Sequence, residues 1–280
     1  MSPTLALSTG SLYTYGIARV FELAAEAGFD AMEIMVDHRW DSRQPAYLQR
    51  LSQDHGLPVA AIHSPFVPHV PGWPQDPLGR LREAISLAHA VGTEVVVTHL
   101  PMRLRAARIE FYGLRAKPLM VPIFIPTDRD YRGFLLGGLA RFESENDITV
   151  GVENMPAHQV FGCRWSPWAL NQIDVLEGMP HLTLDTTHLG TWGLDPLAIY
   201  ERLKTKVIHV HLSNFGGEEH QLPEDGHLPL AELLQRLSQN GYPGAVSLEF
   251  NPKMLQPEDE VRVREHLQAA VRFCRGHMAS

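Results

Sequence analysis

The sequence predicts an α/β protein of the (β/α)8 TIM-barrel class, and three observations support this prediction. Amphipathic stretches alternate with short apolar runs along the whole chain, as expected for helices that follow the strands of a parallel sheet. Eight of these runs have the length of a strand. The chain has 280 residues, a size that one barrel of this class commonly reaches. We therefore expect residues 1–280 to form one domain.

The elements follow in order from these signals. The expected strands are residues 5–8, 31–35, 59–63, 94–99, 149–153, 182–185, 207–212 and 245–250. Helices are expected to end at glycines that adopt a left-handed conformation before the next strand. These glycines are Gly28, Gly56, Gly92, Gly178 and Gly241. Helix starts are expected where a capping side chain precedes proline, which is favoured at the first helical position. These pairs are Asp76-Pro77, Ser166-Pro167 and Asp195-Pro196.

One stretch, at about 101–127, departs from this regular alternation. It mixes apolar residues with several cations, among them Arg103, Arg115 and Lys117. Insertions after barrel strands lie on the face that carries activity, so we expect a lid or substrate-binding loop here. A solvated excursion or a contact between copies of the chain is the alternative.

Strand periodicity predicts which polar residues face the barrel lumen. Side chains two apart share a face, so in the strand 149–153 the valines face outward and Glu153 faces inward. The same parity applies to six strands in succession, each of which ends on an Asp, Glu or His at the carboxyl rim where active sites of this fold lie. These residues are His63, His99, Glu153, Asp185, His211 and Glu249.

Carboxylates and imidazoles that converge at one rim are costly unless protons or a cation neutralise them, so the pattern predicts a metal site. The expected ligands come one from each of the last four strands: Glu153, Asp185, His211 and Glu249. His63, His99 and His188 are further candidates for binding metal or substrate. Taken singly, each of these residues is more often a helix cap or a hydrogen-bonded core residue, and only the joint pattern favours ligands.

Other polar and aromatic residues near the rim receive separate interpretations. His209 faces the lumen one layer below His211, so we expect a hydrogen-bonded core histidine. Glu33 has lumen parity and either orients a ligand or binds substrate hydroxyls. We expect Trp192 either to stack on a bound substrate or only to wall the mouth, and Phe66 is a second aromatic candidate for substrate contact.

The motifs VENM, LDTTH, HVHLSN followed by EEHQLPEDG, and SLEF resemble the metal-binding strand ends of the xylose isomerase-like TIM barrels, which include sugar (phosphate) isomerases and epimerases and endonuclease IV. In the epimerase-like members, the residues matching Glu153, Asp185, His211 and Glu249 bind one divalent metal, commonly manganese, and the two glutamates move the proton. The resemblance to endonuclease IV extends this set and implies up to three zinc ions. The added residues would be His63, His99, His188, Glu218 and His220.

The resemblance leaves three functions open. The first is a metal-dependent isomerase or epimerase of a sugar or sugar phosphate, with Glu153 and Glu249 as base and acid and His188 on a substrate oxygen. The second is a multi-zinc phosphodiester hydrolase acting on abasic DNA, in which Phe66 could wedge into the duplex. The third is a metal-binding protein without turnover. Departures in the regions 155–158 and 216–217 argue against a standard ketose 3-epimerase.

Composition limits the partners and the compartment. A net charge of -8 and a pI near 6.0 give no sign of a global basic surface, so a nucleic-acid partner belongs only to the hydrolase alternative. The absence of a long apolar run or a signal-peptide pattern argues against a membrane and favours a cytoplasmic location. The two cysteines, which form no pair motif, agree with this. Barrels of this type often pair, so a homo-oligomer is an open alternative to a monomer.

Overall fold

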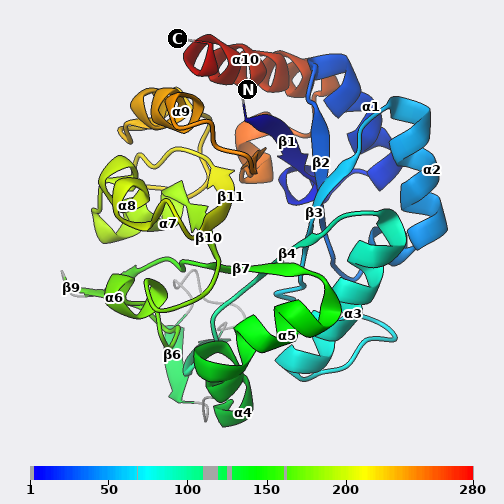
Figure 1. The fold of residues 1–280 in the computed structure, drawn as a ribbon. Coiled ribbons are helices and arrows are strands. Elements are labelled where there is room, and N and C mark those ends of the chain that lie inside the picture. Colours follow the sequence, from blue (N-terminus) through cyan, green and yellow to red (C-terminus); the bar gives the residue numbers. More distant parts are fainter. Residues whose placement is uncertain (1–2, 68, 110–118, 125–127, 161–162, 280) are drawn as a thin grey trace.

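The central sheet is a closed parallel barrel (Figure 1). The computed structural model describes residues 3–67, 69–109, 119–124, 128–160 and 163–279. Within these residues eight strands pair in parallel in the order β1-β12-β11-β10-β7-β4-β3-β2, which confirms the predicted (β/α)8 barrel. The strands are β1 (Thr4–Ser8), β2 (Ala31–Met35), β3 (Val59–His63), β4 (Val95–Thr98), β7 (Thr149–Glu153), β10 (Leu182–Asp185), β11 (Val207–Leu212) and β12 (Ala245–Leu248).

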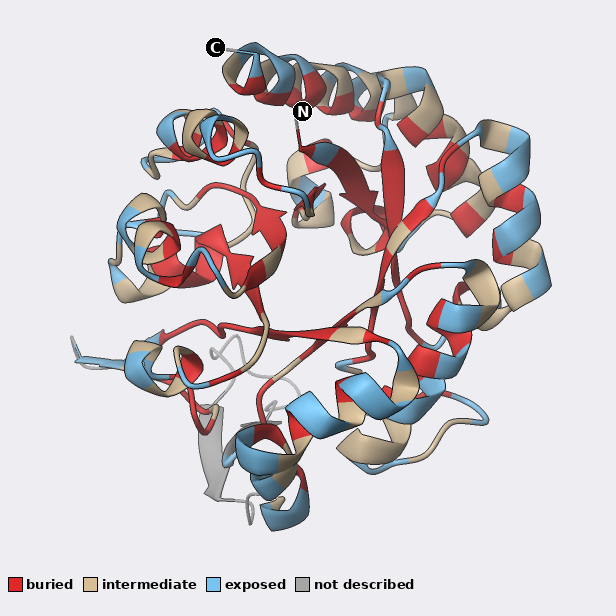
Figure 2. Cartoon of the chain, viewed as in Figure 1, coloured by how far each residue is buried: buried red, intermediate tan, exposed pale blue. Residues whose placement is uncertain are grey.

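Helices surround the barrel and cover its outer face. The barrel strands are coloured mostly as buried, and the long helices turn their buried residues toward the sheet and their exposed residues outward (Figure 2). The apolar strand residues Val96, Val152 and Val210 are fully buried in this layer, as the predicted parity requires. The helices are α1 (Ile17–Ala27), α2 (Pro45–His55), α3 (Pro77–Val91), α4 (Arg129–Gly133), α5 (Leu139–Asn146), α6 (Ile173–Leu176), α7 (Thr186–Trp192), α8 (Pro196–Leu203), α9 (Leu230–Gln239) and α10 (Glu260–Met278).

Short helical turns complete the connections between these elements. Three are 3-10 turns and one is a single π-helical turn between α4 and α5. They are η1 (Thr9–Leu12), η2 (Asp41–Arg43), η3 (Phe134–Gly138) and η4 (Pro252–Leu255). No helix within the described residues combines the length and the apolar character needed to cross a bilayer.

Most of the predicted helix boundaries are confirmed. Gly28, Gly56 and Gly92 end α1, α2 and α3 with φ of 91°, 65° and 81°. The side chain of Asp76 caps α3 and that of Asp195 caps α8, each directly before the proline that begins the helix.

Two of the predicted boundaries are wrong. Gly178 is not a left-handed terminator: α6 ends at Leu176, the next residue Glu177 caps it in a right-handed conformation, and Gly178 does not have a positive φ. No helix begins at Ser166-Pro167. The Ser166 hydroxyl instead accepts a hydrogen bond from the Trp168 amide at 3.3 Å, so the capping chemistry serves a turn.

Two antiparallel hairpins interrupt the regular alternation after β4 and β7. The first pairs β5 (Leu104–Ile109) with β6 (Leu119–Phe124), within the stretch expected to be an inserted loop, and the second pairs β8 (His158–Val160) with β9 (Cys163–Trp165). Part of the expected loop, including Arg115 and Lys117, lies outside the described residues. Backbone hydrogen bonds from Ala169 to Pro101 at 2.8 Å and from Arg103 to Pro167 at 2.9 Å join the segments that flank the two hairpins.

The cap of α3 yields a stability prediction. Asp76 is exposed and its Oδ1 accepts from the Gly79 amide at 2.6 Å, so Asp76→Ala removes a cap without disturbing the core. We expect the free energy of unfolding in urea to fall by about 1 kcal/mol. Asp76→Asn, which keeps an acceptor at this position, should retain most of the stability. Equal losses in the two variants would contradict the capping role.

Candidate metal centre

The four predicted ligands converge at the carboxyl ends of four adjacent strands. Glu153, Asp185, His211 and Glu249 each offer one N or O atom, and these atoms all lie within 4.8 Å of one another. The Nδ1 atom of His211 is at the centre of the group. It lies 3.0 Å from Glu249 Oε2, 3.2 Å from Glu153 Oε1 and 3.7 Å from Asp185 Oδ2.

The chemistry of this group suits a divalent cation. Glu153 Oε2, Asp185 Oδ2 and Glu249 Oε2 are buried and accept no hydrogen bond of good geometry, although imidazole nitrogens lie 2.9 Å, 3.7 Å and 3.0 Å from them. An unpaired buried carboxylate oxygen is costly, and a cation bound to oxygen and imidazole nitrogen removes that cost. Three carboxylates and one imidazole are ligands that both manganese and zinc accept. The residues present therefore fit the metal that the sequence predicts.

Asp185 is at once a helix cap and a candidate ligand. Its Oδ1 accepts from the His188 amide at 2.8 Å and so begins α7, while its Oδ2 faces the other three ligands. The two oxygens divide the two roles between them. The helix that Asp185 caps carries His188 in its first turn, which brings the imidazole to the same rim.

Asn154, which sequence reasoning missed, holds this segment in place. Its side chain accepts from the Asp185 amide at 2.8 Å and donates to the Asp185 carbonyl at 3.0 Å, and its own carbonyl lies 2.8 Å from His188 Nδ1. Thr186 and Thr187 tie the start of α7 to the chain after β11, through bonds to the Ser213 and Asn214 carbonyls. The motifs VENM and LDTTH are therefore joined to each other.

Two further histidines approach Glu153 from the side of β3 and β4. His99 Nε2 lies 2.9 Å from Glu153 Oε2, and His63 Nε2 lies 3.5 Å from the same atom. His63, Glu153 and His211 form a second group of atoms close enough to hold a metal.

His188 and His220 lie on the opposite side, where Asp185, His188 and His220 form another such group. Their rings meet edge to face with centroids 5.3 Å apart. The structure thus brings His63, His99, His188 and His220 to the rim as expected.

Glu218 does not join them. Its side chain is half exposed and pairs with Lys253 Nζ at 2.5 Å, so the expectation that it lies beside His220 as a ligand is wrong for this structure. The neighbouring Glu219 faces the site, with Oε2 4.0 Å from His188 Nε2. Both residues lie in a loop that has no strand periodicity, so no sequence pattern distinguishes them.

Glu33 and His209 lie below the ligands inside the barrel. Both are buried, and Glu33 Oε2 is 2.5 Å from His209 Nε2 and 3.0 Å from His211 Nε2. His209 is the hydrogen-bonded core histidine that parity predicts. Since Glu33 is completely buried and shared by two imidazoles, its position favours the orienting role over contact with substrate hydroxyls.

Aromatic side chains surround the mouth. Phe66 is 58% exposed and its ring centroid lies 6.0 Å from that of His99. Trp192 is half-buried, and its Nε1 donates to the Met155 carbonyl at 3.1 Å, which fixes the indole. Trp168, which the sequence analysis did not single out, lies edge to face with His99 at 5.7 Å. It comes from the segment after the second hairpin, and strand parity does not extend to that segment.

The electrostatics of the group reflect these contacts. Burial alone would lower the pKa of His188, but Asp185 and Glu153 outweigh it and raise the pKa to about 10. Burial likewise opposes ionisation of Glu249, but His211 outweighs it and lowers the pKa to about 2. The pKa of His211 is raised well above its ordinary value, against the effect of burial, by Glu33, Glu249 and Glu153. Imidazolium and carboxylate charges thus balance each other when no cation is bound.

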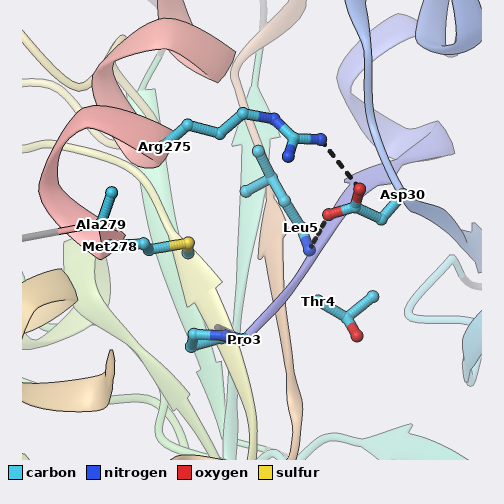
Figure 3. A pocket seen from close by; sticks show the side chains of 7 residues that line it. All are labelled: Pro3, Thr4, Leu5, Asp30, Arg275, Met278 and Ala279. Carbon is cyan, nitrogen blue, oxygen red and sulfur yellow. Dashed lines mark hydrogen bonds and ion pairs between the residues drawn. The ribbon is translucent and has the colours of Figure 1, made fainter. Parts of the chain in front are cut away.

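A pocket at the opposite end of the barrel has a different character (Figure 3). It lies beside the start of β1 and the end of α10, and its two charged side chains pair with each other, Arg275 to Asp30 at 2.8 Å. Asp30 also accepts from the Leu5 amide at 3.0 Å. These charges are therefore already satisfied, and the carboxyl rim is the better candidate for chemistry.

Comparison with known proteins identifies the family. The chain belongs to the xylose isomerase-like TIM barrel family, whose sequence profile matches residues 21–272. An uncharacterized protein of Mycobacterium tuberculosis is 27% identical over 298 residues, which cover 98% of this chain and 97% of the relative.

Solved structures share the fold. The 3-keto-D-glucoside 4-epimerase of E. coli has a TM-score of 0.66 at 16% identity and covers 98% of this chain and 100% of its own. A family 2 AP endonuclease of Brucella melitensis has a TM-score of 0.63 at 19% identity, covering 90% of this chain and 94% of its own. Proteins named for both reaction classes that the sequence leaves open therefore share this barrel.

The charge balance predicts that metal binding displaces protons. Because the pKa values of His188 and His211 are raised, these imidazoles carry protons at neutral pH that a cation must replace or repel. We expect proton release on addition of Mn²⁺ in weak buffer, and tighter binding at about pH 8 than at about pH 6. An affinity that is the same at both pH values would contradict this balance.

Proposed function

We propose that this xylose isomerase-like barrel is a divalent-metal-dependent isomerase or epimerase of a sugar or sugar phosphate, which moves a proton next to a carbonyl. One observation carries the proposal: Glu153 and Glu249 both approach Nδ1 of His211, at 3.2 Å and 3.0 Å. Two carboxylates placed around one substrate position are what a proton transfer between adjacent carbons, or between the two faces of one carbon, requires.

The two glutamates differ in their access to substrate. Glu153 is almost fully buried, while the side chain of Glu249 is 14% exposed. They come from β7 and β12, which β10 and β11 separate in the barrel, so they face a bound molecule from different directions. The lowered pKa values of both, each caused by imidazoles that outweigh burial, keep them ionised and able to accept a proton. We assign Glu153 and Glu249 as the base and acid pair: the glutamate that accepts the substrate proton as a base becomes the acid that returns it.

Glu153, Asp185, His211 and Glu249 would hold the cation, as the unpartnered carboxylate oxygens favour. A bound divalent ion supplies Lewis acidity that polarises a substrate carbonyl and a neighbouring hydroxyl. His188 would hold a substrate oxygen through Nε2, since its Nδ1 lies 2.8 Å from the Asn154 carbonyl and donates to it. Nε2 would donate while the ring is protonated, as the raised pKa favours, and would accept from a substrate hydroxyl in the neutral ring. Phe66, Trp168 and Trp192 would limit water and contact apolar faces of a sugar.

The acid and base assignment predicts the effect of one substitution. Glu249→Gln removes the proton acceptor but keeps the volume of the side chain, so we expect turnover to fall by about 10²- to 10⁴-fold with an unchanged fold. The measurement is exchange of substrate carbon-bound hydrogen with D2O, across a panel of ketoses, keto-glycosides and their phosphates. Glu218→Gln is the matched control, because Glu218 pairs with Lys253 away from the site. Full exchange by Glu249→Gln would refute the assignment.

A second candidate is hydrolysis of a phosphodiester, such as abasic DNA, by several zinc ions. The observation that favours it is that three groups of possible ligands overlap at one rim. The group of four predicted ligands shares Glu153 and His211 with the group that contains His63, and it shares Asp185 with the group that contains His188 and His220. Against it, Glu218 turns toward Lys253, so one of the residues that the endonuclease pattern requires is displaced. Zinc ions held by these residues would supply an activated water and would neutralise charge on the phosphodiester.

Metal content separates the candidates. For protein purified without chelator and without an immobilised-metal column, we expect plasma mass spectrometry to find about one divalent ion per chain, manganese or zinc. About three zinc ions per chain, together with cleavage of abasic DNA, would favour the hydrolase instead. A loaded protein that neither exchanges hydrogen nor cleaves DNA would support a metal-binding protein without turnover.

A further inference from the structure

We infer that Glu33, together with His209, fixes the tautomer and the orientation of His211, which makes Glu33 a positioning residue of the metal centre. The inference rests on the metal site of the proposed function and deepens it. Glu33 comes from β2 and His211 from β11, which lie apart in the order of the barrel strands, so their contact crosses the barrel interior.

The hydrogen-bond roles follow from the chemistry of the groups. An ionised carboxylate only accepts, so the nitrogen that faces Glu33 Oε2 at 3.0 Å must be the protonated Nε2 of His211. In the neutral ring this leaves the lone pair on Nδ1. That atom faces Glu153, Asp185 and Glu249, the other candidate ligands.

His209 holds the carboxylate in place. Its Nε2 lies 2.5 Å from the same Oε2 atom, and its ring stands at 90° to that of His211 with centroids 5.2 Å apart. Two N–H donors on one oxygen restrict rotation of the buried Glu33 carboxylate. The negative charge behind the imidazole also makes Nδ1 a better electron donor to a cation.

The test compares metal affinity in variants of Glu33 and in a matched control. We expect Glu33→Gln to weaken Mn²⁺ binding by about 10- to 100-fold in competition with a chelator, and Glu33→Met by at least as much. Glu143→Gln is the control. Glu143 is another buried carboxylate that accepts from a histidine, His181 at 2.8 Å, but it lies at the amino end of β7, where it also binds the Val150 amide. Its Mn²⁺ affinity should equal that of the wild type.

Histidine ring resonances provide a measurement that a merely structural role would not change. In the wild-type protein loaded with Zn²⁺, long-range ¹H–¹⁵N correlation spectra should show His211 protonated at Nε2. Protonation at Nδ1, or equal Mn²⁺ affinities of the wild type and Glu33→Gln, would overturn the inference alone. Failure of the wild type to bind Mn²⁺ or Zn²⁺ would overturn the proposed function with it. Because protonation at Nδ1 in the wild-type spectrum would refute the inference, the proposal stays testable even if a variant does not fold.

Discussion

The contact of His211 with the carboxylates that surround it is the interaction on which the rest of the site depends. Buried charges are tolerated only when they are paired, and here one imidazole lies against Glu153 and Glu249 on one side and Glu33 on the other. The barrel makes this possible because parallel strands bring residues distant in sequence to one rim. Residues around the ligands, among them Asn154 and Trp192, then fix the geometry of the site through hydrogen bonds to neighbouring segments.

Much of this could be predicted from the sequence, because strand parity is a strong constraint. A period of two fixes which side chains face the lumen, and this alone places His63, Glu153, Asp185 and His211 correctly. Glycine at the ends of α1, α2 and α3 is equally informative, because few other residues adopt a left-handed conformation without strain. The fold and the convergence of the ligands therefore follow from local patterns.

The features that could not be predicted lie where periodicity ends. Glu218 and Glu219 are adjacent in a loop, and only the position of Lys253 shows which of them turns away. Ser166 has the chemistry of a helix cap but serves a turn, since a local capping signal does not determine the conformation of the next residues. Glu33 has the correct parity, yet its two partners come from the far side of the barrel, which a linear pattern does not describe.

The two roles of the Asp185 carboxylate, as a helix cap and as a candidate ligand, have a consequence for the dynamics of the protein. Asp185 Oδ1 caps the first turn of α7, and Oδ2 faces the candidate ligands. Fraying of this turn and release of a cation would therefore both involve a change in the position of the same side chain. Occupancy of the centre should therefore suppress the local opening of α7. Hydrogen exchange of the His188 amide, which donates to that cap, would therefore be slower when a cation occupies the centre.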